Sequence, residues 1–205
     1  MKKYILLLAA GVLLAACAEK KLVVTEEKVD FETVVSQRRS TRDFDPSAKI
    51  SSEQISEIIA VAQNAPSWRN LEPARYHAVL SEEKLPAAKA LLMGNAERVS
   101  GAAAIVVTTF VKGLSGFRDN GEPVDALGNG WGAYDCGLAN SYFVLAARAA
   151  GFDTLIMGGR DAEGLRSLLG IPETEEIMTA IAVGVRASEP RTPERPALDD
   201  VVKFY

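Results

Sequence analysis

The chain has 205 residues, which predicts one domain, or one domain with an appendage. Hydrophobic residues make up 48% of it and charged residues 24%, close to the average for soluble globular proteins, so the composition argues against a disordered or fibrous chain. The formal net charge of −4 provides no basic surface for a nucleic-acid backbone, and we therefore expect no nucleic-acid partner.

The N-terminus has the pattern of a cleaved export signal. Lys2 and Lys3 precede an uncharged stretch, residues 4–16, which is too short to span a membrane because a spanning helix needs about 20 apolar residues. The stretch ends in Leu-Ala-Ala followed by Cys17, which resembles the bacterial lipoprotein box, and Cys17 is then the residue that receives the lipid. An ordinary signal peptide with a chance cysteine is the alternative.

This pattern divides the sequence into three parts. We expect residues 1–16 to be a lipoprotein-type signal peptide, residues 17–30 to be a charge-rich tether, and residues 31–205 to form the globular domain. The mature protein is then exported and anchored by lipid on Cys17 to a bacterial membrane, on its periplasmic or cell-surface side.

A helix is the first element that we expect in the globular part. Ser51 and Gln54 have the spacing of a capping box, and the apolar residues that follow recur every three or four positions up to Ala62. An Asn-Ala-Pro sequence at residues 64–66 ends this helix, which we place at residues 51–63.

Helices and strands then mix without strict alternation, which predicts an α+β fold with helices packed around a central sheet. A continuous apolar run at residues 103–110 predicts a strand that is buried on both faces. In chain order, the elements after the first helix are a strand at 74–80, a helix at 82–94, that buried strand, a helix at 132–150 ended by Gly151, a strand at 153–157, a helix at 161–169 ended by Gly170 and Pro172, and a strand at 177–185.

Residues 128–133 match the G-x-G-x-x-A pattern of a dinucleotide-binding turn, and Asp153 lies twenty residues further on. That pattern binds a pyrophosphate only where a strand leads directly into the turn. Here a loop of about twenty residues separates the cluster from the preceding strand, so a flexible loop that leads into a helix is the better interpretation.

Two common kinds of catalytic site lack the residues that they need. The chain has only two cysteines, Cys17 and Cys136, and one histidine, His77. A catalytic thiol needs a base beside it, and zinc needs three or four protein ligands, so these counts argue against a hydrolase and against a metal site. Because Cys17 is the expected lipid acceptor, Cys136 is left without a disulfide partner.

The segment at residues 36–44 carries the strongest chemical signal. Arg38, Arg39, Ser40, Thr41 and Arg42 combine three guanidinium groups with two hydroxyls, a set that can surround a phosphate with charge-assisted hydrogen bonds. The alternative is a solvated basic turn that caps a helix.

A second segment offers mixed hydrogen-bonding groups. Residues 65–73 form a loop bounded by Pro66 and Pro73, and Ser67 and Asn70 within it provide both donors and acceptors. Such a loop suits the carbonyl and imide edge of a planar heterocycle.

With these two segments, residues 31–204 resemble the nitroreductase family of FMN-dependent oxidoreductases. Residues 38–42 look like its phosphate-binding motif, residues 65–73 like its Pro-Ser loop, and residues 195–202 like its C-terminal motif. The binding residues that the resemblance implies are Arg38, Arg39, Ser40, Arg42 and Arg195 around the phosphate; Pro66, Ser67 and Asn70 from the partner subunit; Asn95 and Arg98 near the pyrimidine end of the flavin; and Met157, Gly158 and Gly159 at a strand end facing flavin N5.

The resemblance also implies a fold and an activity. The fold is α+β with a central, mainly antiparallel sheet flanked by helices, and the protein is a homodimer that binds FMN. NADH or NADPH passes hydride to flavin N5, and a small-molecule acceptor such as a nitroaromatic or a quinone receives it, so no catalytic side chain is required. Two alternatives remain, namely a flavin enzyme of this fold with other chemistry, such as dehalogenation or flavin breakdown, and a non-catalytic lipoprotein that serves as a binding module.

One position departs from the family pattern. Glu72 stands where the family has a glutamine, and a carboxylate near the flavin or the substrate entrance disfavours anionic substrates.

The spacing of the two binding segments favours a site shared between subunits. The helix at residues 51–63 lies between them and is about 20 Å long, so a partner that supplies Asn70 is the simpler geometry. We place the centre of the interface on the helix at 132–150, whose apolar residues include Leu138, Phe143, Val144 and Leu145.

Overall fold

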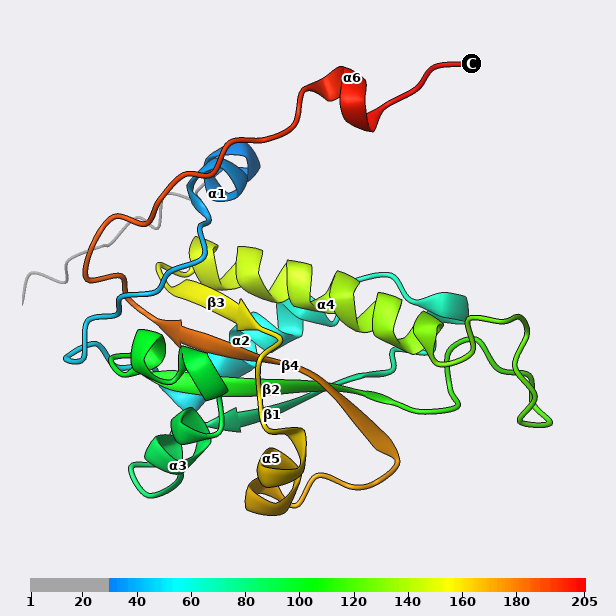
Figure 1. The fold of residues 1–205 in the computed structure, drawn as a ribbon, viewed down its shortest axis with the longest axis horizontal. Helices are drawn as coiled ribbons and strands as arrows, with labels where there is room; N and C mark the ends of the chain where they lie inside the picture. The colour runs from blue at the N-terminus through cyan, green and yellow to red at the C-terminus, as the bar shows by residue number, and fades with distance from the viewer. Residues whose placement is uncertain (1–29) are drawn as a thin grey trace, which may run out of the picture.

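A four-stranded antiparallel sheet is the centre of the fold. In the computed structural model, which describes residues 30–205, every neighbouring pair of strands is antiparallel in the order β1-β2-β4-β3 (Figure 1). The α+β class and the antiparallel sheet expected from the sequence are confirmed. The expected signal peptide, Cys17 and residues 17–29 of the tether lie outside the described residues. The strands are β1 (Ala74–Val79), β2 (Ala104–Val111), β3 (Asp153–Met157) and β4 (Glu175–Gly184).

Helices cover both faces of this sheet, and β2 supplies side chains to the core on each side. Ile105 and Val107 pack into the core beneath one face, whereas Ala104 and Val106 pack into the core beneath the other. The predicted burial of this strand on both faces is therefore confirmed. The helices are α3 (Lys84–Ala90) and α5 (Ala162–Leu169) on the first face, and α2 (Ser52–Ala62) and α4 (Gly130–Ala149) on the second.

Local capping signals account for several boundaries. The side chain of Ser51 accepts a hydrogen bond from the Gln54 N–H, and the side chain of Gln54 accepts one from the Ser51 N–H, so the predicted capping box is present. Gly170 ends α5 with a φ of 67°, in the left-handed region that favours glycine.

One predicted helix is wrong in its length. The helix expected at residues 82–94 ends at Ala90, and the chain continues in short 3-10 turns at Met93–Asn95 and Glu97–Val99. Leu92 is fully buried, and Met93 has a φ of 51°, so the chain turns here to place Leu92 in the core.

A smaller shift affects the long helix, α4, which begins at Gly130 instead of residue 132. Gly132 lies against β2, where an added Cβ would approach the Phe110 ring to 2.4 Å, so glycine permits the close packing of α4 on the sheet. Among residues 30–205, no helix has both the length and the apolarity needed to cross a membrane.

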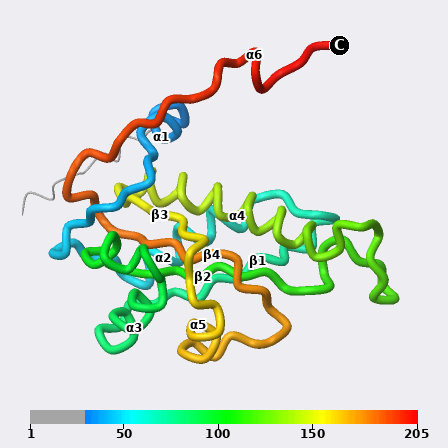
Figure 2. The backbone as a smooth tube through the Cα atoms, viewed as in Figure 1, coloured from blue at the N-terminus to red at the C-terminus, as the bar shows by residue number. Residues whose placement is uncertain are grey.

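The C-terminal residues form an arm that leaves the body. After β4 the chain passes α1 (Phe31–Gln37) and then projects away from the rest of the protein, carrying the short helix α6 (Leu198–Val201) (Figures 1 and 2). Almost every residue of the arm is exposed, including the large apolar residues Leu198 and Phe204. The arm thus carries large apolar side chains that the rest of the described chain leaves exposed.

Candidate functional site

The basic segment lies along the edge strand β3. Ser40 pairs with Thr154 in a parallel bridge, and the N–H of Thr41 donates to the carbonyl of Thr154 at 3.0 Å. Thr41 is buried, so in this extended segment the neighbouring side chains of Ser40 and Arg42 point away from the core. This extended segment therefore presents the Ser40 hydroxyl and the Arg42 guanidinium on the same side.

Three arginines from opposite ends of the domain converge beside this segment. Burial lowers the pKa of Arg38, and the positive charges of Arg39 and Arg195 lower it further. Within residues 30–205, none of Arg38, Arg39, Arg42 and Arg195 forms an ion pair with a carboxylate. Like charges held together without a countercharge favour an anion site over the solvated-turn alternative.

The other predicted binding residues of this half meet at the far end of β3. The side-chain amide of Asn95 donates to the carbonyl of Gly159 at 3.4 Å, and Arg98 donates to the side-chain oxygen of Asn95 at 3.2 Å. Gly158 and Gly159 are exposed, so their backbone is accessible to a ligand.

Met157 does not contribute its side chain to this surface. It is 3% exposed and belongs to the core beneath the sheet, so only its backbone is available to a ligand, and its role in binding stays a prediction for the backbone alone. Side chains alternate along a strand, and the neighbouring Ile156 is instead 44% exposed. Ile156 therefore adds an apolar surface between the basic segment and the glycine turn.

The Pro-Ser loop is a separate, strained structure. Arg69, Asn70 and Glu72 have φ values of 51°, 56° and 48°, a left-handed conformation that costs non-glycine residues roughly 1–2 kcal/mol each. Two contacts hold the loop: the Trp68 N–H donates to the carboxylate of Asp135 at 3.0 Å, and the Glu72 N–H donates to Ser67 Oγ at 2.9 Å.

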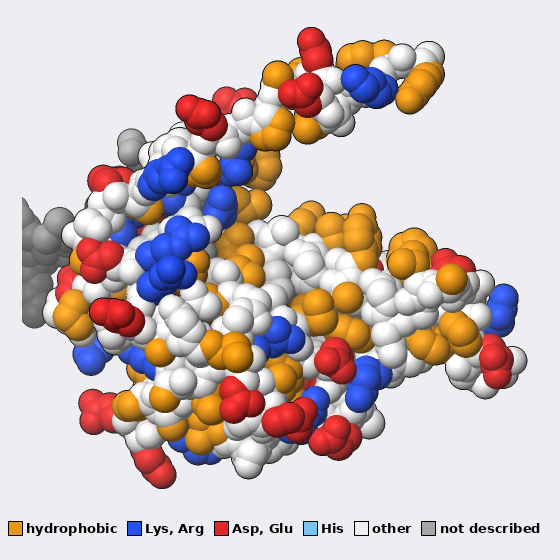
Figure 3. Space-filling view, in the orientation of Figure 1, with side chains coloured by type: hydrophobic (Ala, Val, Ile, Leu, Met, Phe, Trp, Pro, Cys, Tyr) orange, Lys and Arg blue, Asp and Glu red, His pale blue; other side chains and the backbone are white. Residues whose placement is uncertain are grey.

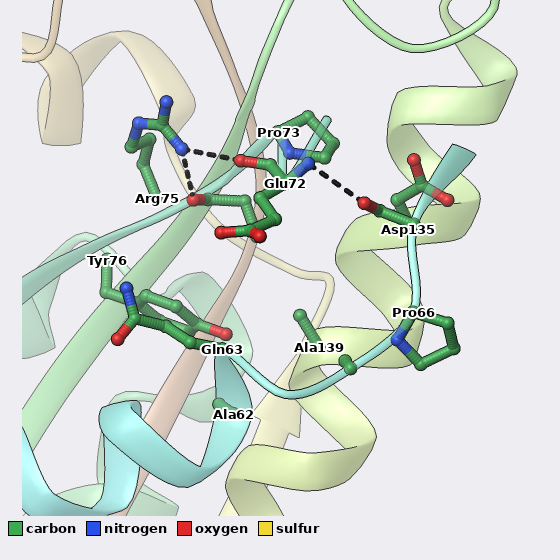
Figure 4. A pocket seen from close by; sticks show the side chains of 12 residues that line it. Ala62, Gln63, Pro66, Glu72, Pro73, Arg75, Tyr76, Asp135 and Ala139 are labelled. Carbon is green, nitrogen blue, oxygen red and sulfur yellow. Dashed lines mark hydrogen bonds between the residues drawn. The ribbon is translucent and has the colours of Figure 1, made fainter. Parts of the chain in front are cut away.

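Behind the loop lies a small pocket of about 60 Å³, between the end of α2, the start of β1 and α4 (Figure 4). Glu72, Tyr76 and Asp135 line it, and the Tyr76 hydroxyl is buried without a hydrogen-bond partner among residues 30–205. A pocket of this size accommodates water and is far too small for a flavin, so the ligand surface of the loop lies elsewhere.

The two halves of the site do not meet within one chain. Asp135 of α4 holds the Pro-Ser loop. Near the other end of the same helix, Arg148 donates a hydrogen bond to the side chain of Gln37, the residue before the basic segment. At 1.5 Å per residue, these two positions on α4 are about 20 Å apart. The helix thus keeps Asn70 and Arg38 well separated.

Comparison with known proteins identifies the family of this chain. Residues 35–185 match the model of the family described as "Nitroreductase family". The chain belongs to the nitroreductase family. The chain is 25% identical over 203 residues to a protein named as an NAD(P)H nitroreductase, YdgI of Bacillus subtilis, with 85% of this chain and 97% of YdgI covered. It is 28% identical over 193 residues to the CLA biosynthesis enone reductase of Lactiplantibacillus plantarum, with 78% and 88% covered.

Solved structures resemble this chain over most of its length. A nitroreductase-like protein of Exiguobacterium sibiricum, solved in complex with FMN, has a TM-score of 0.77 at 23% identity and covers 86% of this chain and 98% of its own. The enone reductase CLA-ER has a TM-score of 0.76 at 26% identity, with 85% and 97% covered. The predicted fold and enzyme class are confirmed, and the roles of individual binding residues stay predictions.

Sequence reasoning missed the buried aspartates that support the site. Asp135 holds the Pro-Ser loop, and Asp153, which lies at the spacing of a dinucleotide-binding acid, is instead buried in ion pairs with Arg148 and Arg186. Residues 128–133 are the end of a loop and the start of α4, which confirms the interpretation as a loop leading into a helix. No pattern within a short window distinguishes such aspartates from solvated ones.

Neither the single described cysteine nor the histidine is among the predicted binding residues. Burial raises the pKa of Cys136 to about 11, so its thiol is not a nucleophile at neutral pH. His77 Nε2 lies 2.8 Å from a carboxylate oxygen of Glu175, on β1 and β4 respectively.

Proposed function

We propose that this nitroreductase is an FMN-dependent oxidoreductase that passes hydride from NADH or NADPH to a small-molecule acceptor such as a nitroaromatic or a quinone. The observation that supports it most is the layout along β3. Arg38, Arg39 and Arg195 gather without a countercharge near one end, and Gly158 and Gly159 lie at the other. A ligand with a phosphate at one end and a planar ring at the other matches this layout.

The chain's own residues have binding and electrostatic tasks. Arg38, Ser40, Arg42 and Arg195 hold the phosphate through charge-assisted hydrogen bonds. The backbone N–H of Gly158 or Gly159 donates toward N5, and Arg98, held by Asn95, places positive charge near the pyrimidine edge, where it favours the reduced, anionic form. FMN, when bound, supplies the hydride chemistry.

A homodimer completes the proposed site. Because α4 separates the Pro-Ser loop from the basic segment, Pro66, Ser67 and Asn70 reach a flavin only from a second copy. The exposed apolar side chains of the arm and the exposed Tyr134 of α4 offer surfaces for that copy. Figure 3 shows hydrophobic side chains on the side of the body that faces the arm, with an open gap between them.

The expected centre of this interface needs a correction. Phe143 and Val144 are 0% and 6% exposed and pack into the core with α2, because they lie on the face of α4 that covers the sheet. Leu138 and Leu145 are half-buried, and Tyr134 and Tyr142 are the exposed aromatic residues of the helix. The interface we propose therefore uses the tyrosine-bearing side of α4.

Sedimentation of the full chain in detergent should give a dimer, and a monomer that still binds FMN and turns over would contradict the shared site.

We also propose export and lipid anchoring through Cys17, which the sequence pattern supports. Cys17→Ser should release the protein from the membrane fraction or leave an unprocessed precursor. A variant that fractionates and migrates like the wild type would contradict the anchor.

The proposed activity is tested by following the flavin absorbance of the purified full chain. Addition of NADH or NADPH without oxygen should bleach it, and a nitroaromatic or a quinone should restore it. A colourless protein that takes up no FMN would favour the non-catalytic binding module. A flavoprotein that neither nicotinamide reduces would favour other flavin chemistry.

A further inference from the structure

A buried ion-pair cluster lies at the first residue of β3. The carboxylate of Asp153 is 2% exposed, and its Oδ1 accepts hydrogen bonds from Arg148 at 3.0 Å and from Arg186 at 2.6 Å. Its Oδ2 accepts from the side-chain Nε of Arg186 at 3.0 Å and from the Arg186 backbone N–H at 3.1 Å. Both oxygens are therefore fully engaged, by Arg148 from α4 and by Arg186, two residues after the end of β4.

Both arginines continue from Asp153 to the same residue of α1. Arg148 donates to the side-chain oxygen of Gln37 at 3.2 Å, and Arg186 donates to the Gln37 backbone carbonyl at 3.4 Å. Gln37 is the last residue of α1, and Arg38 follows it directly. Asp153 thus acts, through two arginines, on the point where the basic segment begins.

The same stretch of β3 also holds the middle of the basic segment. Thr154, the residue after Asp153, pairs with Ser40 and accepts from the Thr41 N–H. Two consecutive residues of one strand therefore determine where residues 37–41 lie.

The cluster is a support and not a second anion site. A hollow of about 440 Å³ lies next to it, lined by Arg39, Arg148 and Arg186 among others. Each nitrogen of the Arg186 guanidinium already donates to Asp153, Glu189 or Gln37. Little hydrogen-bonding capacity is left there for a ligand.

The charge of Asp153 is present at neutral pH. Burial alone would raise its pKa, but hydrogen bonds from Arg186 and the positive charges of Arg186 and Arg148 outweigh this and hold the pKa below its ordinary value. Loss of that charge would leave Arg148 without an ion-pair partner among the described residues and Arg186 with only the exposed Glu189, next to Arg39.

We infer that Asp153 is a positioning residue for the phosphate of the cofactor. Through Arg148 and Arg186 it holds Gln37, and thereby sets the direction in which Arg38 and Ser40 present their donors. This inference rests on the proposed function, because it assumes that the basic segment binds the FMN phosphate.

The test compares Asp153→Asn with Glu189→Gln in the full chain, solubilised in mild detergent and freed of flavin by dialysis. Glu189 is the matched control, because it also bonds Arg186, at 2.9 Å, but is 86% exposed and has no bond to Gln37. Dissociation constants are measured for FMN and for riboflavin, which has the ring but no phosphate. Asp153→Asn should weaken FMN binding about tenfold or more and riboflavin binding less than about threefold, whereas Glu189→Gln should leave their ratio unchanged within about twofold.

The FMN-to-riboflavin ratio separates positioning from general loss of structure. If Asp153→Asn keeps the wild-type ratio, or weakens both ligands equally, the inference is overturned while the proposed function stands. If the wild type binds neither ligand, the proposed function itself fails. If Asp153→Asn does not fold, Gln37→Ala decides, since it removes only the side-chain acceptor of Arg148: a lowered ratio supports the inference, and an unchanged ratio overturns it.

Discussion

Replacement of Arg38 by alanine tests the phosphate-binding role of the basic segment most sharply. A hydrogen bond to a charged group contributes about 1.5–3 kcal/mol, and the loss of one phosphate contact sets the scale of the effect. Arg39 and Arg195 remain beside the vacated position and can move toward the phosphate, so we expect the lower half of this range. FMN affinity should then fall by roughly 10- to 30-fold, which corresponds to about 1.5–2 kcal/mol.

The stability of the flavin-free protein should not fall when Arg38 is replaced by alanine. Burial and the neighbouring Arg39 and Arg195 disfavour the charge of Arg38, so its removal should leave the flavin-free protein at least as stable as the wild type. The assay is fluorescence titration of FMN together with thermal unfolding of the flavin-free protein. Lys84→Ala is the control, because it removes one positive charge from an exposed position on α3. Wild-type FMN affinity in Arg38→Ala would return the segment to the solvated-turn interpretation.

Three further outcomes follow from the described contacts. Cys136, whose pKa burial raises to about 11, should not react with a thiol reagent at pH 8 until the protein is unfolded; rapid reaction of the native protein would contradict its burial. Asp135→Asn should lower turnover more than folding stability, because the Trp68 N–H loses a charged acceptor and the Pro-Ser loop loosens; unchanged kinetics would show that the loop needs no such support. The pKa of Asp153 is lower in the folded protein than its unfolded value of about 3.9, so its stabilising contribution is present above about pH 4 and is lost as the pH falls through the folded pKa. In urea unfolding, the stability difference between wild type and Asp153→Asn should therefore narrow below pH 4, and a constant difference would contradict this.

Local signals in the sequence predicted the elements whose ends depend on neighbouring residues. The capping box of Ser51 and Gln54 and the left-handed Gly170 both act within one helical turn, and the helices they bound were placed correctly within a residue or two. The early end of α3 was not predictable in this way, because it depends on the burial of Leu92 against the sheet.

In the candidate site, too, the residues within short segments were predictable, whereas the contacts between distant segments were not. Arg38, Ser40 and Asn70 belong to segments whose composition suits a ligand, and the resemblance to a known family implied their roles in binding it. The supporting contacts join residues that are far apart in the sequence, such as Trp68 with Asp135 and Gln37 with Arg148. Nothing within a short window records such pairs, because tertiary packing of α4 brings them together.

Mass analysis of the cofactor released from the purified full chain tests the central proposal most directly. The account predicts FMN, because Arg38, Arg39 and Arg195 end the ligand at its phosphate, whereas the neighbouring Arg148 and Arg186 are engaged by Asp153. Recovery of FAD, or of no flavin even after incubation with FMN, would contradict it.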